Sequence, residues 1–155
     1  MPANDRSQRR LPVGLITAAA LLLIVRAAVP APADRVDWVS LEEAPARAAA
    51  TGKPILYEFT AAWCAPCQQM AREVFTDPMA AIAIGMRAVP VRVVDRTLED
   101  GVNTPAVAAL MERCAVKGFP FLVLADADGR VIAKLSGLRT RSDVLHLLER
   151  RTARR

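Results

Sequence analysis

The run Trp63-Cys64-Ala65-Pro66-Cys67 constrains the fold of this chain more than any other stretch of its sequence. It follows Ile55 to Thr60, a β-prone run whose apolar residues point to both faces, as in a central strand covered on both sides. A helical pattern from about Cys64 to Phe75 comes next. Two cysteines three residues apart at a helix start share one face, so they can close a small disulfide without any unfolding. The sequence therefore predicts a strand, a dithiol and a helix in immediate succession.

Extended and helical patterns alternate through the chain between about residues 35 and 150, which is typical of an α/β layer structure. Asp126 to Gly129 has the composition of a hairpin turn, so the two strands flanking it should make the sheet mixed. The polar stretch from Thr97 to Asn103 is too irregular to assign. The expected order is β-α-β-α-β-α-β-β-α, with strands at 36–40, 55–60, 89–95, 121–125 and 130–136 and helices at 41–50, 64–75, 78–84, 104–113 and 140–150.

The N-terminal residues 1–33 differ in composition from the rest of the chain. The run Leu11 to Val25 holds no charge and follows three arginines, which matches the basic and apolar regions of an export signal. Extended to Val29 it covers 19 residues, nearly a membrane span interrupted by Arg26, and this favours an uncleaved anchor. The small-x-small motif Ala31-Pro32-Ala33 keeps cleavage as an alternative, and a buried hairpin helix of a soluble protein is a third. By the positive-inside rule, the domain faces outward.

The chain of 155 residues is long enough for one compact domain with short extensions. We expect a leader and linker at 1–33, the domain at 34–150 and a basic tail at 151–155. The basic residues behind the net charge of +5 lie largely at the two ends, so the charge gives no reason to expect nucleic acid as a partner. We interpret the tail as solvated, with a membrane-surface or nucleic-acid role as the alternative.

The position of the dithiol at a helix start favours thiolate chemistry, because unpaired N–H groups and the helix dipole lower the pKa of the Cys64 thiol. Cys64 would attack a target disulfide, and Cys67 would then displace the target and leave it reduced. A closed zinc site is a weaker alternative, since only Cys114 and His146 could complete it. Gln68 stands where a covalent haem site needs histidine, so neither metal nor cofactor is expected. An inert structural disulfide of an exported protein remains a further alternative.

Two motifs carry a resemblance to the thioredoxin family. Residues 53–67 resemble the family's core motif, and Val116 to Pro120, ahead of a strand, resembles its loop with a cis proline. The resemblance spans roughly 36–148 and implies a thioredoxin-like fold, a three-layer α/β/α arrangement around a central mixed sheet, here preceded by an N-terminal apolar helix. Among relatives, the Trp38 region and the long connection before Thr104 look most like the C-terminal reductase domain of the DsbD subfamily.

The resemblance also implies roles for individual residues. Pro120 would be cis and would turn the Phe119 backbone outward, where it can pair with an extended substrate segment. Glu58 takes the place of a buried acid beneath the second cysteine, where desolvation raises the pKa and the carboxylate can accept the Cys67 proton. The family more often has Asp there, and a merely tolerated strand-end charge is the alternative. Trp63 would cover one side of the disulfide at the substrate site, or serve packing alone.

These roles predict a thiol:disulfide oxidoreductase that acts on protein disulfides and dithiols. The Ala-Pro pair between the cysteines resembles that of reducing thioredoxins more than strongly oxidising variants, which favours a reductase of exported proteins. Its electrons would come from a membrane or periplasmic thiol donor, and it would be a monomer anchored on the periplasmic side of the inner membrane, or periplasmic if the signal is cleaved. An oxidase or isomerase, or a non-catalytic binding module, are the alternatives. We expect Cys114 to be a buried free thiol, with a regulatory disulfide as the alternative.

Overall fold

Four strands form one mixed sheet in the order β2-β1-β3-β4 within residues 33–150, the part of the chain that this computed structural model describes. β1 pairs parallel with β2 and antiparallel with β3, and β3 pairs antiparallel with β4. The strands are β1 (Ile55–Ala61), β2 (Val89–Asp95), β3 (Phe121–Ala125) and β4 (Val131–Ser136). The helices are α2 (Ala44–Thr51), α3 (Ala65–Met70), the π-helix η1 (Ala71–Phe75), α4 (Pro78–Arg87), α5 (Thr97–Asp100), α6 (Pro105–Arg113) and α7 (Arg141–Glu149).

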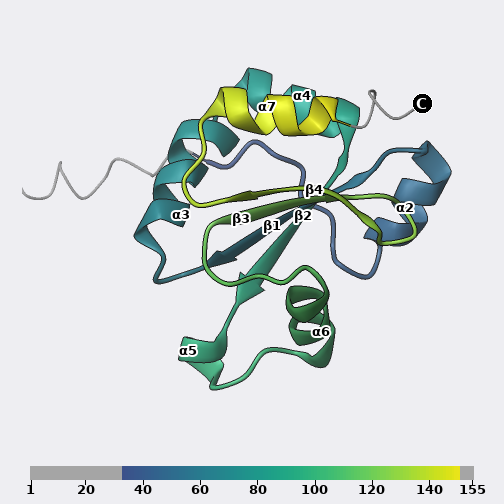
Figure 1. Cartoon of the computed structure of the whole chain (residues 1–155). Helices are drawn as coiled ribbons and strands as arrows, with labels where there is room; N and C mark the ends of the chain where they lie inside the picture. Colours follow the sequence, from purple (N-terminus) through teal and green to yellow (C-terminus); the bar gives the residue numbers. More distant parts are fainter. Residues whose placement is uncertain (1–32, 151–155) are drawn as a thin grey trace, which may run out of the picture. The chain divides into compact units, whose positions relative to one another are not determined.

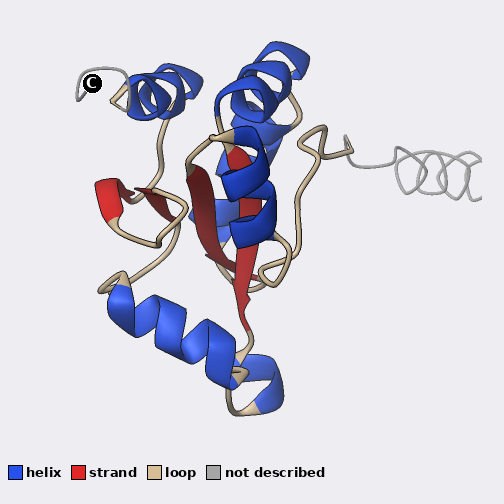
Figure 2. Ribbon diagram, turned by 90° about the vertical axis from the view of Figure 1, so that its right-hand side faces the viewer, coloured by secondary structure: helices blue, strands red, loops and turns tan. Residues whose placement is uncertain are grey.

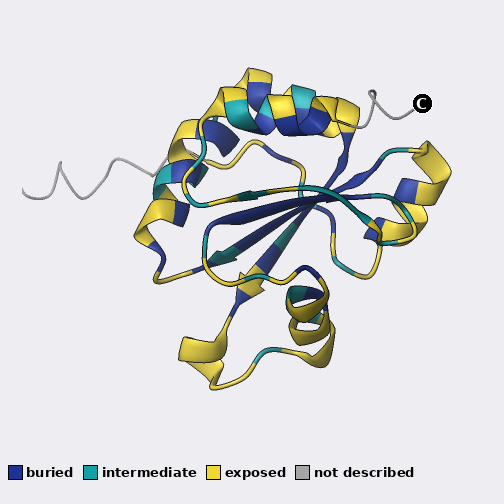
Figure 3. Ribbon diagram, viewed as in Figure 1, coloured by how far each residue is buried: buried dark blue, intermediate teal, exposed yellow. Residues whose placement is uncertain are grey.

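Helices cover both faces of this sheet, as Figures 1 and 2 show. On one face, α2 and α6 pack against alternate residues of β1, among them Tyr57 and Phe59. On the other face, α3, η1, α4 and α7 pack around leucines that include Leu56 and Leu122. β1, β2 and β3 are accordingly mostly buried between the two helical layers, whereas β4 at the edge is partly exposed (Figure 3). The predicted three-layer arrangement and mixed sheet are confirmed.

The expected strand at 36–40 is the prediction that fails most clearly. The structure reduces it to a single parallel bridge between Val39 and Val91. Val36 is buried in the core around α3, α4 and α7, whereas Val39 is buried in the core of the opposite face. The N–H of Trp38 bonds back to the carbonyl of Val36 at 3.0 Å, and this tight turn at Asp37 interrupts the extended backbone that a strand requires. The segment therefore meets β2 at one bridge and does not form a strand of its own.

The predicted helix at 64–75 is present, but its second half is π-helical. The N–H of Thr76 bonds to the carbonyl of Ala71, five residues earlier, at 3.1 Å. This wide turn lets two consecutive residues, Val74 and Phe75, be buried in the same core. A pattern of apolar spacing does not reveal such a turn, because the same residues would also suit an ordinary α-helix.

Smaller differences affect two other helices and the polar stretch after β2. The predicted helix at 78–84 continues to Arg87, and the predicted helix at 41–50 begins at Ala44, with Pro45 in its opening turn as expected. The unassigned polar stretch contains α5, and the Asn103 side chain closes it with hydrogen bonds to the Asp95 side chain and to a backbone N–H.

The expected N-terminal apolar helix and the basic tail lie outside the described residues. Within residues 33–150, no helix has both the length and the apolar character required to cross a membrane. The domain boundaries at 34 and 150 stay predictions.

Candidate functional site

A disulfide joins Cys64 and Cys67 where β1 leads into α3, with Cα atoms 5.2 Å apart. Cys64 is the N-cap residue of α3, and its Sγ accepts a hydrogen bond from the Cys67 backbone N–H at 3.2 Å. The backbone N–H groups of Cys67 and Gln68 also bond to the Cys64 carbonyl. After reduction, a helical amide aimed at the Cys64 sulfur stabilises a thiolate there in preference to a thiol.

An aromatic pair forms the outer side of this dithiol. Both cysteines are nearly buried, with exposed fractions of 3% for Cys64 and 2% for Cys67, and they form a small cluster with Ala61 against which Phe119 packs. Trp63 is 53% exposed, and its ring meets the Phe119 ring edge-on with centroids 5.9 Å apart. The structure therefore brings Trp63 and Phe119 together beside the cysteines.

The loop that contains Pro120 lies at the same end of the sheet. The Phe119-Pro120 peptide bond is cis, which confirms the prediction. Phe121, the next residue, pairs with Phe59 near the end of β1 that leads into Cys64. The Pro120 carbonyl accepts a hydrogen bond from the N–H of Gly137 at 2.9 Å, which ties this loop to the end of β4.

Glu58 is the buried acid of the site, with an exposed fraction of 1%. Because residues of β1 alternate between the faces, Glu58 lies on the α3 side with Leu56. Glu58, Cys67 and Arg92 line one open pocket of about 220 Å³. Burial raises the pKa of Glu58, and the charge and hydrogen bond of Arg92 counter that rise. The carboxyl and the second cysteine thus share one solvent-accessible hollow, and the predicted direction of the pKa shift is confirmed.

The sequence did not predict the two ion pairs of Arg92, one of which holds this carboxyl. Arg92 of β2 lies opposite Glu58 in the parallel register, and its Nε is 2.5 Å from Oε2 of Glu58. Its Nη1 is 2.5 Å from Oδ2 of Asp34. Arg92 is the one charge inside the apolar run 89–94, which is a signal that could have suggested a buried partner. No sequence pattern pointed to Asp34.

Cys114 is a free thiol at the end of α6, and it is only 1% exposed. It belongs to the core on the α2 and α6 face, across the sheet from Glu58. Burial raises the pKa of its thiol and so suppresses its reactivity. The prediction of a buried free cysteine is confirmed.

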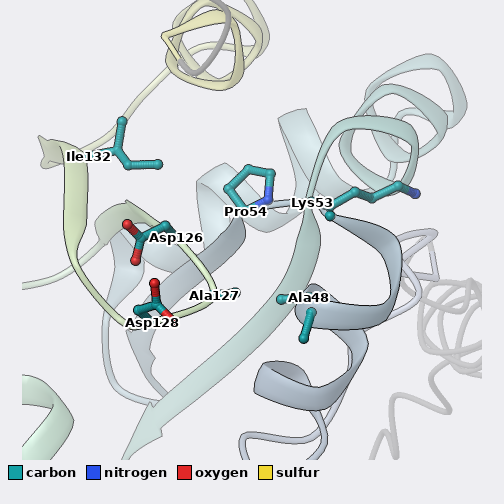
Figure 4. Close-up of a pocket in the computed structure, with 9 residues that line it drawn as sticks. Ala48, Lys53, Pro54, Asp126, Ala127, Asp128 and Ile132 are labelled. Atoms are coloured by element: carbon teal, nitrogen blue, oxygen red, sulfur yellow. The ribbon is translucent and has the colours of Figure 1, made fainter. Parts of the chain in front are cut away.

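A second pocket, of about 250 Å³, lies at the opposite end of the sheet (Figure 4). Two of the charged groups that line it are already engaged: Asp126 accepts hydrogen bonds from the backbone and side chain of Arg130, and Lys53 donates to the Gly85 carbonyl. The Lys53 side chain points away from Asp126 and Asp128 in Figure 4. Within residues 33–150, no three His, Cys, Asp or Glu side chains lie close enough together to hold a metal ion. The dithiol end of the sheet is therefore the candidate active site.

Comparisons with known proteins show which domain this chain resembles. A family model described as a thioredoxin-like domain matches residues 41–152. The chain is 36% identical over 96 residues to the thiol:disulfide interchange protein DsbD of Ralstonia nicotianae, a match that covers 61% of this chain but only 15% of that protein. The chain therefore corresponds to a small part of this relative.

Two solved structures are similar over most of their length. A thioredoxin from Thermus thermophilus has a TM-score of 0.61 and 30% identity, and the match covers 76% of this chain and 88% of that one. The oxidised C-terminal domain of DsbD from Neisseria meningitidis has a TM-score of 0.52 and 25% identity, covering 86% of this chain and 93% of that one.

Proposed function

Because this chain belongs to the thioredoxin-like family of disulfide oxidoreductases, we propose that it is a reductase of disulfides in exported proteins. The observation that carries the proposal is the disulfide between Cys64 and Cys67 at a helix start, with the Cys67 amide directed at the Cys64 sulfur. An inert structural disulfide needs neither that amide nor a buried acid in the adjoining pocket.

The proposed reaction has two exchange steps on the reduced protein. The Cys64 thiolate attacks one sulfur of the target disulfide, forms a mixed disulfide and releases the first target thiolate. Cys67 then gives its proton to the Glu58 carboxylate, and the resulting thiolate attacks Sγ of Cys64. This attack closes the Cys64–Cys67 disulfide and releases the second target thiolate, so two electrons pass from the protein to the target. A thiol donor returns the dithiol to its reduced state.

Substrate binding is assigned to the surface next to the dithiol. The loop of Phe119 and Pro120 lies beside the cysteines and is tied to β4 through Gly137. An extended target segment can pair with the Phe119 backbone, so recognition would depend mostly on the main chain. Trp63, half exposed against Phe119, offers an apolar contact at the edge of that segment.

The reducing direction is supported by the Ala-Pro pair between the cysteines, which resembles the corresponding residues of reducing thioredoxins. The apolar run from Leu11 to Val29 supports a position on the periplasmic side of the inner membrane, held there as a monomer by one N-terminal anchor. A membrane or periplasmic thiol protein would then be the electron donor. Oxidation or isomerisation would use the same residues, and no specific observation favours either.

The full chain, supplied with dithiothreitol, should accelerate reduction of insulin well above the rate with dithiothreitol alone. Turbidity from the released insulin chain measures the rate. A Cys114→Ser variant is the matched control and should keep full activity, because Cys114 is buried on the other face of the sheet. A wild-type rate no greater than that of dithiothreitol alone would contradict the proposal.

A further inference from the structure

Two residues in the segment before α2 hold the guanidinium of Arg92 from different sides. Oδ2 of Asp34 accepts hydrogen bonds from Nη1 of Arg92 at 2.5 Å and from Nε1 of Trp38 at 2.9 Å. The Trp38 ring lies against the guanidinium, with its centroid 4.2 Å from Cζ of Arg92, and the Phe75 ring, which packs edge-on against Trp38, has its centroid 5.5 Å from the same atom. Nη2 of Arg92 is buried and has no hydrogen-bond partner among residues 33–150. The two carboxylates and the aromatic rings therefore fix the guanidinium.

The same guanidinium decides the charge of Glu58. The charged and titratable groups that face Glu58 are Arg92 from β2, Asp34 from the segment before α2, and Cys67 of α3 in the shared pocket. Burial disfavours the Glu58 carboxylate, and Arg92 is the one group among these that stabilises it. A buried carboxyl that keeps its own proton cannot accept another, so the placement of Arg92 controls whether Glu58 can act as a base.

We propose that Asp34 and Trp38 are positioning residues for the resolving step: they hold Arg92 against Glu58 and so keep Glu58 ready to accept the Cys67 proton. This inference rests on the proposed function, because it deepens the role given there to Glu58. The pair of Arg92 and Asp34 is not a simple surface contact, since each side chain is only 27% exposed and the guanidinium also holds a buried carboxylate.

The substitution Asp34→Asn tests this proposal with little change in shape. Asparagine offers one oxygen where the carboxylate offered two, so it cannot satisfy Arg92, Trp38 and the Val36 N–H, which all bond to Asp34. The reduced full chain is mixed with one equivalent of dithiobis-nitrobenzoate, whose thiolate is coloured. Attack by Cys64 releases the first thiolate and attack by Cys67 releases the second, so the second phase reports the resolving step alone.

We expect the rate of the second phase to rise with pH as Glu58 ionises, and Asp34→Asn to move the midpoint of that rise upward by about one pH unit. Trp38→Leu should move it in the same direction. The first phase should not change. The sign is diagnostic, because the negative charge of Asp34 by itself raises the pKa of Glu58, and its simple loss would lower the midpoint.

Asp37→Asn is the matched control, since it removes the same charge from an exposed position in the same segment and should leave the midpoint unchanged. An unchanged or lowered midpoint in Asp34→Asn overturns the positioning role while leaving the proposed function intact. A Glu58→Gln variant distinguishes failure of this positioning role from failure of the role that the proposed function gives to Glu58. If that variant keeps the wild-type midpoint, the rise does not belong to Glu58, and its role in the proposed function fails as well.

Discussion

Replacement of Cys64 by serine should reduce the rate of disulfide reduction to that of dithiothreitol alone, a loss on the order of a thousandfold or more. The reason is that a serine hydroxyl at this helix start stays protonated at neutral pH, whereas the Cys67 amide that reaches Sγ of Cys64 stabilises a thiolate. The insulin assay measures the loss. Activity that survives in Cys64→Ser would show that the nucleophile is another residue.

Replacement of Cys67 by serine provides the matched comparison, because it leaves the attacking thiol in place and removes the resolving one. This variant should also lose turnover, but it should accumulate a mixed disulfide between Cys64 and the target. Mass spectrometry of the protein after reaction with one equivalent of target detects the adduct. An adduct on Cys67 in the Cys64→Ser variant, with none on Cys64 in the Cys67→Ser variant, would reverse the assignment of the two cysteines.

Glu58→Gln should slow the resolving step by about a hundredfold at neutral pH, while the first attack by Cys64 stays at its normal rate. Glutamine has nearly the shape of glutamate but cannot accept the Cys67 proton. The thiol must then lose its proton to solvent, so the rate should keep rising with pH past about 8.5, the ordinary pKa of a cysteine. The second phase of dithiobis-nitrobenzoate reduction measures this step. A normal second phase in Glu58→Gln would remove Glu58 from the reaction.

The pH dependence of stability provides a check on the same residue. The folded pKa of Glu58 is raised by burial, which Arg92 only partly counters, so the protonated carboxyl favours the folded state. That contribution is present below the unfolded value of about 4.3 and is lost as the pH rises through the folded pKa. The free energy of unfolding of the wild type should therefore fall relative to Glu58→Gln over this range, as urea titrations at several pH values would show. A relative gain with rising pH would mean that the carboxylate is the favoured form in the folded state.

Local patterns in the sequence were sufficient for most of the elements that place the dithiol. The strands predicted at 89–95 and 121–125 have those bounds in the structure, because each β-prone run ends where polar residues begin. The helix predicted to start after Thr104 does so, and the Thr104 side chain accepts a hydrogen bond from the Val107 N–H. Such signals act within a few residues, so they can be read without knowing the fold.

Contacts between distant segments could not be predicted in this way. The pairing of Glu58 with Arg92 depends on the register between β1 and β2, which no pattern within either strand determines. Asp34 lies 58 positions from Arg92 along the chain, and nothing around it marks it as a partner of the site. The dithiol and its acid were therefore identified from the sequence, whereas the residues that set the charge of the acid emerged only from the structure.

The equilibrium reduction potential of the Cys64 and Cys67 pair tests the reductase proposal most directly. The full chain is equilibrated with defined ratios of reduced and oxidised glutathione. The oxidised fraction is then measured by alkylating the free thiols and recording the masses of the products by mass spectrometry. We predict a value of about −270 mV, the potential of thioredoxin. A value of about −120 mV, the potential of the oxidant DsbA, would contradict the proposal and show that the pair accepts electrons from its targets.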